Sequence, residues 1–169
     1  MVYHEQIDRS VTADAVRDLG APESVSNEDM ETPVFQEIMV EITKKTAYIN
    51  PACYNFDEVV NTVIQQVCGQ DVADWDDFLT EEESNYLQER LTQNGHWMLG
   101  YPFFTQYDPR EYEDNAKFDT LLFQMDSEMA DNREDYVLWG DCGVGNFFIA
   151  REDLEKCDFS RVLYNWDCC

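Results

Sequence analysis

The sequence predicts an α+β protein in which two amphipathic helices precede an antiparallel sheet in the C-terminal third. Apolar residues between positions 56 and 68 recur at the spacing of one helix face. Thr80 and Glu83 stand three residues apart at the start of a second helical pattern, as in a capping box. After residue 95 the chain consists of short, alternating aromatic segments separated by turn residues, which is typical of antiparallel strands. Because 169 residues with 44% hydrophobic content suffice for one core, we expect a single domain over residues 1–169.

The segment before the first helix carries weaker patterns. Residues 2–7 alternate as a short strand does, and residues 8–32 are polar, with Gly20 and Pro22 as breakers. Residues 33–48 are rich in β-branched and aromatic side chains. Their first half is compatible with either a helix or a strand, and we interpret the second half as a strand. We therefore expect a strand and loop segment ahead of the helices.

Both helices have recognisable ends. Asn55 is expected to cap the first helix, and Gly69 follows its last apolar residue. In the second helix the Thr80 hydroxyl and the Glu83 carboxylate can satisfy each other's backbone donors, and we expect the helix to run to about Gln93. The apolar face of the first helix is formed by Phe56, Val59, Val60, Val63, Ile64, Val67 and Cys68.

Four alternating segments predict the strands of the sheet, namely residues 120–126, 136–139, 146–150 and 161–167. The second and third of these flank a glycine-rich loop, so we predict a hairpin over residues 136–150. Residues 153–155 predict one short helical turn between the last two strands. We expect the core of the sheet to contain Leu138, Phe147, Tyr164 and Trp166.

Charge is the outlying property of the composition. The chain has 36 Asp and Glu residues against 11 Lys and Arg residues, for a net charge of -25. Such a surface repels nucleic-acid phosphates and anionic membranes, so we expect it to bind neither. It attracts basic proteins, and the acidic residues are densest in residues 24–31 and 71–83. The alternative is that the acidity serves solubility alone.

The expected location is the cytoplasm. No apolar run approaches the roughly 18 to 20 residues of a membrane helix, and the N-terminal ten residues have no signal-peptide pattern. The six cysteines form no Cys-x-x-Cys pair, and we expect them to be reduced thiols.

The glycine-rich loop and the histidines each have a functional and a structural interpretation. Glycines in residues 140–145 could direct backbone N–H groups at a phosphate, but their spacing matches no nucleotide-binding fingerprint. A hairpin turn with positive φ at several positions explains them. His96 could activate Cys142 or Cys157 as a nucleophile, but a surface or packing role is the better explanation of this histidine. We therefore expect no bound cofactor.

The acidic and cysteine pairs also have a functional and a structural interpretation. Asp126 and Asp141 both end predicted strands and could form a catalytic or metal-binding pair, although chance proximity is expected among 36 acids. Cys168 and Cys169 are adjacent and would point to opposite faces of a strand, which is poor geometry for one zinc ion. We expect no metal site.

A series of characteristic segments follows residue 95, namely residues 100–106 (GYPFFTQ), 108–110 (DPR), 121–126 (LLFQMD), 139–149 (WGDCGVGNFFI), 158–160 (DFS) and 165–169 (NWDCC). In their order and spacing these segments resemble the C-terminal half of the YwqG family of bacterial proteins, a domain of unknown function. The resemblance covers about residues 95–169 well and residues 1–54 loosely. It implies that a full-length member has a second, similar half, so the chain is expected to be a shortened homologue or a fragment that holds one wall of any shared site.

Two functions follow as expectations. The first is a non-catalytic intracellular interaction protein whose acidic face binds a basic partner, as an inhibitor or immunity-type protein does. The alternative is an enzyme or small-molecule binder with a cleft lined by the Gly-Tyr-Pro and Trp-Gly-Asp segments. The candidate ligand-binding residues for that cleft are His96, Gln106, Arg110, Gln124, Asp126 and Asp141.

Overall fold

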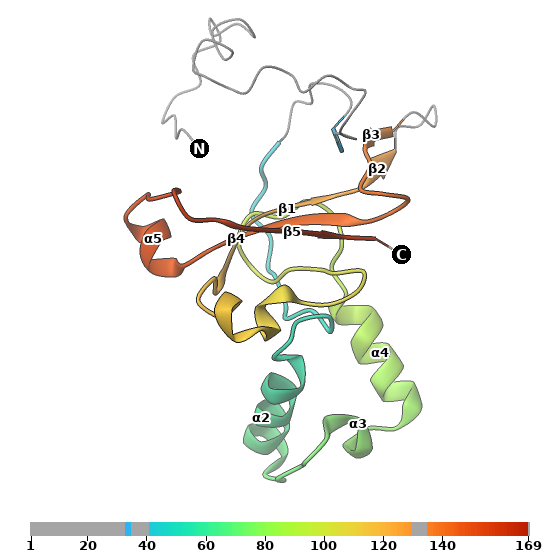
Figure 1. Ribbon diagram of the computed structural model, residues 1–169. Helices are drawn as coiled ribbons and strands as arrows, with labels where there is room; N and C mark the ends of the chain where they lie inside the picture. The colour runs from blue at the N-terminus through green and yellow to red at the C-terminus, as the bar shows by residue number, and fades with distance from the viewer. Residues whose placement is uncertain (1–32, 35–40, 130–134, 169) are drawn as a thin grey trace, which may run out of the picture. The chain divides into compact units, whose positions relative to one another are not determined.

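A computed structural model describes residues 33–34, 41–129 and 135–168, and the side chains of residues 135 and 136 are left out of the description. These residues belong to the compact unit Val34–Cys169, apart from Pro33. The α+β class is confirmed: helices come first, and an antiparallel sheet follows in the C-terminal part (Figure 1). The segments predicted from residues 2–7 and 8–32 lie outside the described residues.

The first predicted helix is present with the predicted bounds, as α2 (Phe56–Cys68). Gly69 ends it in the left-handed conformation, with φ of 69°. Asn55, however, does not cap it, and this expectation is wrong. The backbone of Asn55 has φ of -104° and ψ of 15°, outside the extended conformation from which a cap side chain reaches the first N–H groups of a helix.

A four-residue helix, α3 (Trp75–Phe78), was not predicted. Asp74 caps it by accepting a hydrogen bond from the N–H of Asp76, at 3.0 Å. Trp75 is buried against Phe56 and Ile64, and its indole N–H donates to Asp57 at 2.7 Å. The helix is too short to produce a periodic pattern, so its formation depends on burying this one indole.

The second predicted helix is α4 (Glu81–Leu91), two residues shorter than expected at its C-terminal end. Its capping box is complete: the N–H of Glu83 donates to the Thr80 hydroxyl, and the N–H of Thr80 donates to the Glu83 carboxylate at 2.9 Å. Hydrogen bonds from the backbone and the side chain of Thr80 lower the pKa of Glu83 below its ordinary value of 4.5.

We predict that Thr80→Ala raises the pKa of Glu83 part of the way back to 4.5, because the backbone hydrogen bond remains when the hydroxyl is lost. Since the folded pKa is depressed, the capping box stabilises α4 fully above pH 4.5 and loses its effect as the pH falls through the folded pKa. An NMR titration of the Glu83 carboxyl measures this. Thr92→Ala, at the other end of α4, is the control, and an equal shift in both variants would contradict the assignment.

The strand expected in the second half of residues 33–48 is absent from residues 41–48, which have no regular structure. Ile42 is 76% exposed, so its β-branched side chain packs on nothing that would stabilise a strand. At the other end of this segment Val34 forms an isolated bridge with Val137.

The main sheet has three antiparallel strands in the order β1-β4-β5, namely β1 (Thr120–Asp126), β4 (Val144–Ile149) and β5 (Leu163–Asp167) (Figure 1). The short helix α5 (Arg151–Glu155) connects β4 to β5, as predicted. Two 3-10 turns, η1 (Pro109–Glu111) and η2 (Glu113–Asn115), precede β1.

The hairpin predicted over residues 136–150 is wrong. β3 (Asp135–Val137) pairs with β2 (Glu128–Met129) in a separate two-stranded sheet, whereas β4 pairs with β1 and β5. The loop between β3 and β4 does close a tight turn, with the N–H of Gly143 donating to the Trp139 carbonyl at 2.7 Å. Turn chemistry predicts such a turn but does not decide which strands pair on either side of it.

Positive φ at several positions does not explain the glycines of this loop. Gly140 alone of the three has positive φ, at 62°. Gly145 is required by close approach, since a Cβ atom there would overlap the Trp139 ring, at 2.6 Å from Cη2 and closer still to Cζ2. Gly143 is likewise closed in by backbone carbonyl groups.

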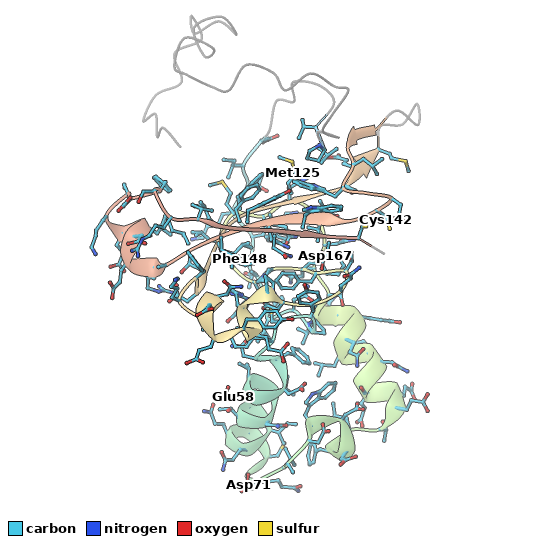
Figure 2. All side chains as sticks on the ribbon, in the orientation of Figure 1. Glu58, Asp71, Met125, Cys142, Phe148 and Asp167 are labelled. Carbon is cyan, nitrogen blue, oxygen red and sulfur yellow. The ribbon has the colours of Figure 1, made fainter. Side chains whose placement is uncertain are left out.

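The expected core face of the sheet is also corrected. Tyr164 and Trp166 are 49% and 47% exposed, and Phe147 and Leu138 are half-buried. The core lies on the opposite face, where Phe148 is fully buried with Leu121 and Phe104. Figure 2 shows Met125 and Phe148 on opposite faces of the sheet. Alternation separates two faces of a strand, but both faces here carry aromatic residues, so alternation did not identify the packed one.

No helix within the described residues is long and apolar enough to cross a lipid bilayer.

Candidate functional site

A row of three buried polar side chains crosses the core face of the main sheet. Gln124 of β1 lies opposite Asn146 of β4, and Asp167 of β5 lies on the same face, two residues beyond the partner of Asn146. Gln124 and Asn146 are completely buried, and Asp167 is 7% exposed. Buried polar groups are costly unless they are hydrogen-bonded, so this row needs partners.

The partners come from residues 103–106, part of the segment that carries the family resemblance. Gln124 accepts a hydrogen bond from the N–H of Phe103 at 2.7 Å, and the Asn146 amide donates to the Phe103 carbonyl at 3.0 Å. Asp167 accepts from the N–H of Gln106 at 2.9 Å. One polar residue from each strand therefore holds this segment against the sheet. We call Gln124, Asn146, Asp167 and residues 103–106 the strap layer.

Three oxygen atoms of the strap layer are buried and, within the described part of the chain, have no hydrogen-bond partner. They are Asn146 Oδ1, Asp167 Oδ1 and Thr105 Oγ1. Such atoms are rare in folded proteins, because an unsatisfied buried acceptor costs about 1–3 kcal/mol.

Gln124, a predicted ligand-binding residue, is fully engaged in holding two loops. Besides accepting from Phe103, its amide donates to the Gly95 carbonyl at 2.7 Å. The backbone of Gln124 also exchanges hydrogen bonds with Trp97. This side chain acts in the fold and is not accessible to a ligand from solvent.

Asp126 and His96 lie together at the end of β1. Asp126 accepts a hydrogen bond from the N–H of Gly95 at 2.6 Å, and its own N–H donates to His96 Nδ1 at 3.2 Å. His96 Nε2 lies 2.8 Å from a carboxylate oxygen of Glu128. Because Nδ1 accepts a hydrogen bond, the neutral imidazole carries its proton on Nε2. This N–H donates a hydrogen bond to the Glu128 carboxylate. This is the one place where the structure brings a candidate histidine and a candidate carboxylate together.

Arg110 is buried and paired. Its Nε lies 2.9 Å from Asp108 Oδ1 and its Nη2 lies 2.6 Å from Asp108 Oδ2, while its guanidinium lies over the Phe148 ring at 4.7 Å. Burial opposes the positive charge, but the hydrogen bonds and the charge of Asp108 outweigh it and raise the pKa of Arg110. The Arg110 N–H groups therefore form buried hydrogen bonds inside the protein.

Cys53 lies near this ion pair and is 4% exposed. Burial raises the pKa of its thiol to about 11, so the thiol stays protonated near neutral pH and is a poor nucleophile. Cys53, Cys68, Cys157 and Cys168 form no disulfide in the described part of the chain.

The remaining two candidates are exposed. The Gln106 side chain donates to the Cys168 carbonyl at 2.5 Å, beside the end of β5. Asp141 lies in the turn before β4, at 3.9 Å from the Cys142 sulfur. Gln106 and Gln124 share the strap layer, and Asp126 and His96 share the end of β1, whereas no hydrogen bond or ion pair joins Asp141 or Arg110 to the other four candidates within the described residues.

The sequence patterns did not predict a role for Asn146 and Asp167. Both lay within the segments that carry the resemblance, and both are polar residues in otherwise apolar or aromatic strands. A polar residue on the buried face of a strand could have indicated these two positions. The sequence does not show which face of the strand is buried.

A hollow of about 460 Å³ lies on α4, away from the strap layer residues. It is lined by Glu81, Glu82, Asn85, Tyr86 and Glu89. Tyr86 is 67% exposed there, between carboxylates one helical turn before and after it. An exposed aromatic ring flanked by carboxylates is suited to a cationic side chain.

Residues 1–168 match the family described as Domain of unknown function (DUF1963), and the chain belongs to this family. The match covers nearly the whole chain, whereas the resemblance seen in the sequence was clear over residues 95–169. A search of curated proteins found no match.

Proposed function

We propose that this member of the DUF1963 family is a YwqG-like, non-catalytic interaction protein that binds a basic protein partner, as an inhibitor or immunity-type protein does. One observation carries the proposal. Residues 55–93, which contain α2, α3 and α4, hold ten carboxylates and a single basic residue, Arg90. All ten carboxylates are exposed. We call them the acidic helical surface: Asp57, Glu58, Asp71, Asp74, Asp76, Asp77, Glu81, Glu82, Glu83 and Glu89.

The acidic residues divide into two groups by their contacts. Asp57, Asp74, Asp76 and Glu83 accept hydrogen bonds that hold the three helices. The carboxylates of the other six make no hydrogen bond or ion pair within the described part of the chain. They are available to cations, and because α2, α3 and α4 pack on one apolar cluster, these charges lie in one region of the molecule, where they focus the electrostatic potential.

The hollow on α4 supports a basic side chain as the group that is bound. Glu82, Tyr86 and Glu89 follow one another at helical spacing, so they lie on one face of α4. An arginine or lysine over the Tyr86 ring would gain a cation–π contact and lie between carboxylates. The charge of -25 on the whole chain would raise the rate of encounter with such a partner.

We expect the triple variant Glu81→Gln, Glu82→Gln, Glu89→Gln to bind a fluorescent deca-arginine peptide about tenfold more weakly than the wild type, since three exposed pairs contribute modestly each. Fluorescence anisotropy at low salt measures the affinity. Binding of the wild type should weaken as salt is raised, because the Debye length is about 8 Å at physiological ionic strength.

The matched control is Asp141→Asn, Glu152→Gln, Glu155→Gln, which removes three exposed carboxylates outside α2, α3 and α4. If both triple variants lose affinity equally, the acidity acts through net charge alone and the acidic helical surface is not a specific site. Capture of a basic protein from the source lysate, with retention lost in the first variant and kept in the control, would identify the partner.

A further inference from the structure

We propose that the strap layer holds a buried, hard cation coordinated by Asn146 Oδ1, Asp167 Oδ1 and Thr105 Oγ1. The proposal is independent of the acidic helical surface. It starts from the fact that these three oxygen atoms are buried and unsatisfied within the described part of the chain.

The three residues belong to one small region of the fold. Asn146 and Asp167 are on the same face of neighbouring strands, in diagonal positions whose Cα atoms lie about 7–8 Å apart in an antiparallel pair. Asn146 is bonded to Phe103 and Asp167 to Gln106, so Thr105 lies in the short segment tied down at both ends. Figure 2 shows the Asp167 side chain on the same side of the sheet as Phe148, which is the packed face.

The hydrogen bonds of Asn146 and Asp167 identify the side-chain oxygen atoms that remain without a donor. The Phe103 carbonyl can only accept, so the Asn146 amide must turn its Nδ2 towards that carbonyl, which directs Oδ1 elsewhere. Asp167 uses Oδ2 for the N–H of Gln106, which leaves Oδ1. Both remaining atoms are acceptors, and an acceptor is satisfied by a donor or by a cation.

Charge favours the cation over a water molecule. Asp167 is 7% exposed, and no ion pair to it is present among the described residues. Two other buried aspartates have a counter-charge: Asp108 pairs with Arg110, and Asp153 pairs with Arg161. A water molecule could donate hydrogen bonds to the two acceptors but would leave the buried negative charge uncompensated.

The donor atoms define the class of ion. One carboxylate, one amide and one hydroxyl are oxygen ligands of the kind that Ca²⁺, Mg²⁺ and the alkali cations use, whereas zinc and copper sites use nitrogen and sulfur. The Phe103 carbonyl has a second lone pair in the same layer and can complete the set.

The test compares thermal unfolding of the full chain in choline chloride with unfolding in CaCl₂, MgCl₂, NaCl or KCl at matched ionic strength. Choline screens the surface charge but is too large to enter the strap layer. We expect at least one of the four coordinating cations to raise Tm by about 5 °C beyond choline at a saturating concentration. That rise should disappear in Asp167→Asn, which keeps an oxygen for the N–H of Gln106, and should persist in Asp141→Asn.

Two results would overturn the proposal. One is a wild-type Tm that is the same in all five salts, which would assign the three oxygen atoms to buried water. The other is a cation-specific rise that survives in Asp167→Asn, which would place the ion elsewhere.

Thr105→Val keeps the proposal testable if Asp167→Asn does not fold. It preserves the shape and the charge and removes a single oxygen ligand, so the concentration of the effective cation needed for half of the Tm rise should increase several-fold. An unchanged midpoint would exclude Thr105 as a ligand and, with no Asp167→Asn protein to measure, would count against the site as drawn.

Discussion

Asp108→Ala is expected to lower the free energy of unfolding by about 3–5 kcal/mol, because it leaves the buried guanidinium of Arg110 without its counter-charge. Asp108 is 3% exposed and Arg110 is 7% exposed. The same carboxylate also accepts hydrogen bonds from the N–H groups of Tyr54 and Arg110, at 3.3 Å and 3.0 Å. The substitution therefore removes the anion that orders the turn at η1 as well as the ion pair. Urea unfolding monitored by tryptophan fluorescence measures the loss.

Asp153→Ala is the matched control, since Asp153 also accepts hydrogen bonds from an arginine, Arg161, through both of its carboxylate oxygens. The Arg161 side chain that is left behind is 65% exposed and stays solvated, so the loss of this pair should cost about 1 kcal/mol or less. Equal losses in the two variants would show that burial does not govern the stability of these pairs.

Gly143→Ala is expected to destabilise the protein by about 3 kcal/mol or more, because the added Cβ atom meets backbone atoms that cannot rotate away. It would lie 2.8 Å from the Trp139 carbonyl oxygen and still closer to the carbonyl oxygen of Asp167. The turn that Gly143 closes onto Trp139 would have to open, and the end of β5 would have to move away from β4. Thermal unfolding measures the loss of stability, and the near-ultraviolet dichroism of Trp139 reports the local change.

Gly69→Ala separates close approach from backbone conformation. Gly69 has φ of 69°, and a Cβ atom there would have no neighbour within 4 Å. Its substitution should cost about 1 kcal/mol, from the left-handed backbone alone. If Gly69→Ala proved more harmful than Gly143→Ala, the crowding around Gly143 would not be the reason for the glycine.

Local sequence determined the elements whose signals lie within a few residues of one another. The apolar spacing of residues 56–68 predicted α2, and the Thr80 and Glu83 pair predicted the start of α4. The alternation of residues 120–126 predicted β1 with its observed bounds. These elements form where i, i+4 contacts, caps or alternate side chains are decided locally. The expectation of a family of unknown function is confirmed by the match to DUF1963 over residues 1–168.

The candidate site needed the tertiary structure. Sequence reasoning proposed Gln124 as a residue that lines a cleft, but the packing of residues 103–106 across the sheet makes it part of the strap layer. Asn146 and Asp167 became candidates only once their unsatisfied oxygen atoms were known to be buried.

Composition and local pattern by themselves determined the class, the two helices, the outer strands of the main sheet and the negative charge of this protein. Tertiary structure alone decided that β3 pairs with β2, that Phe148 and not Tyr164 or Trp166 is in the core, and that residues 41–48 form no strand. The physical reason is that each of these depends on a partner distant in sequence. A strand with aromatic residues on both faces is equally regular whichever face packs, and the choice is made by the segment that covers it.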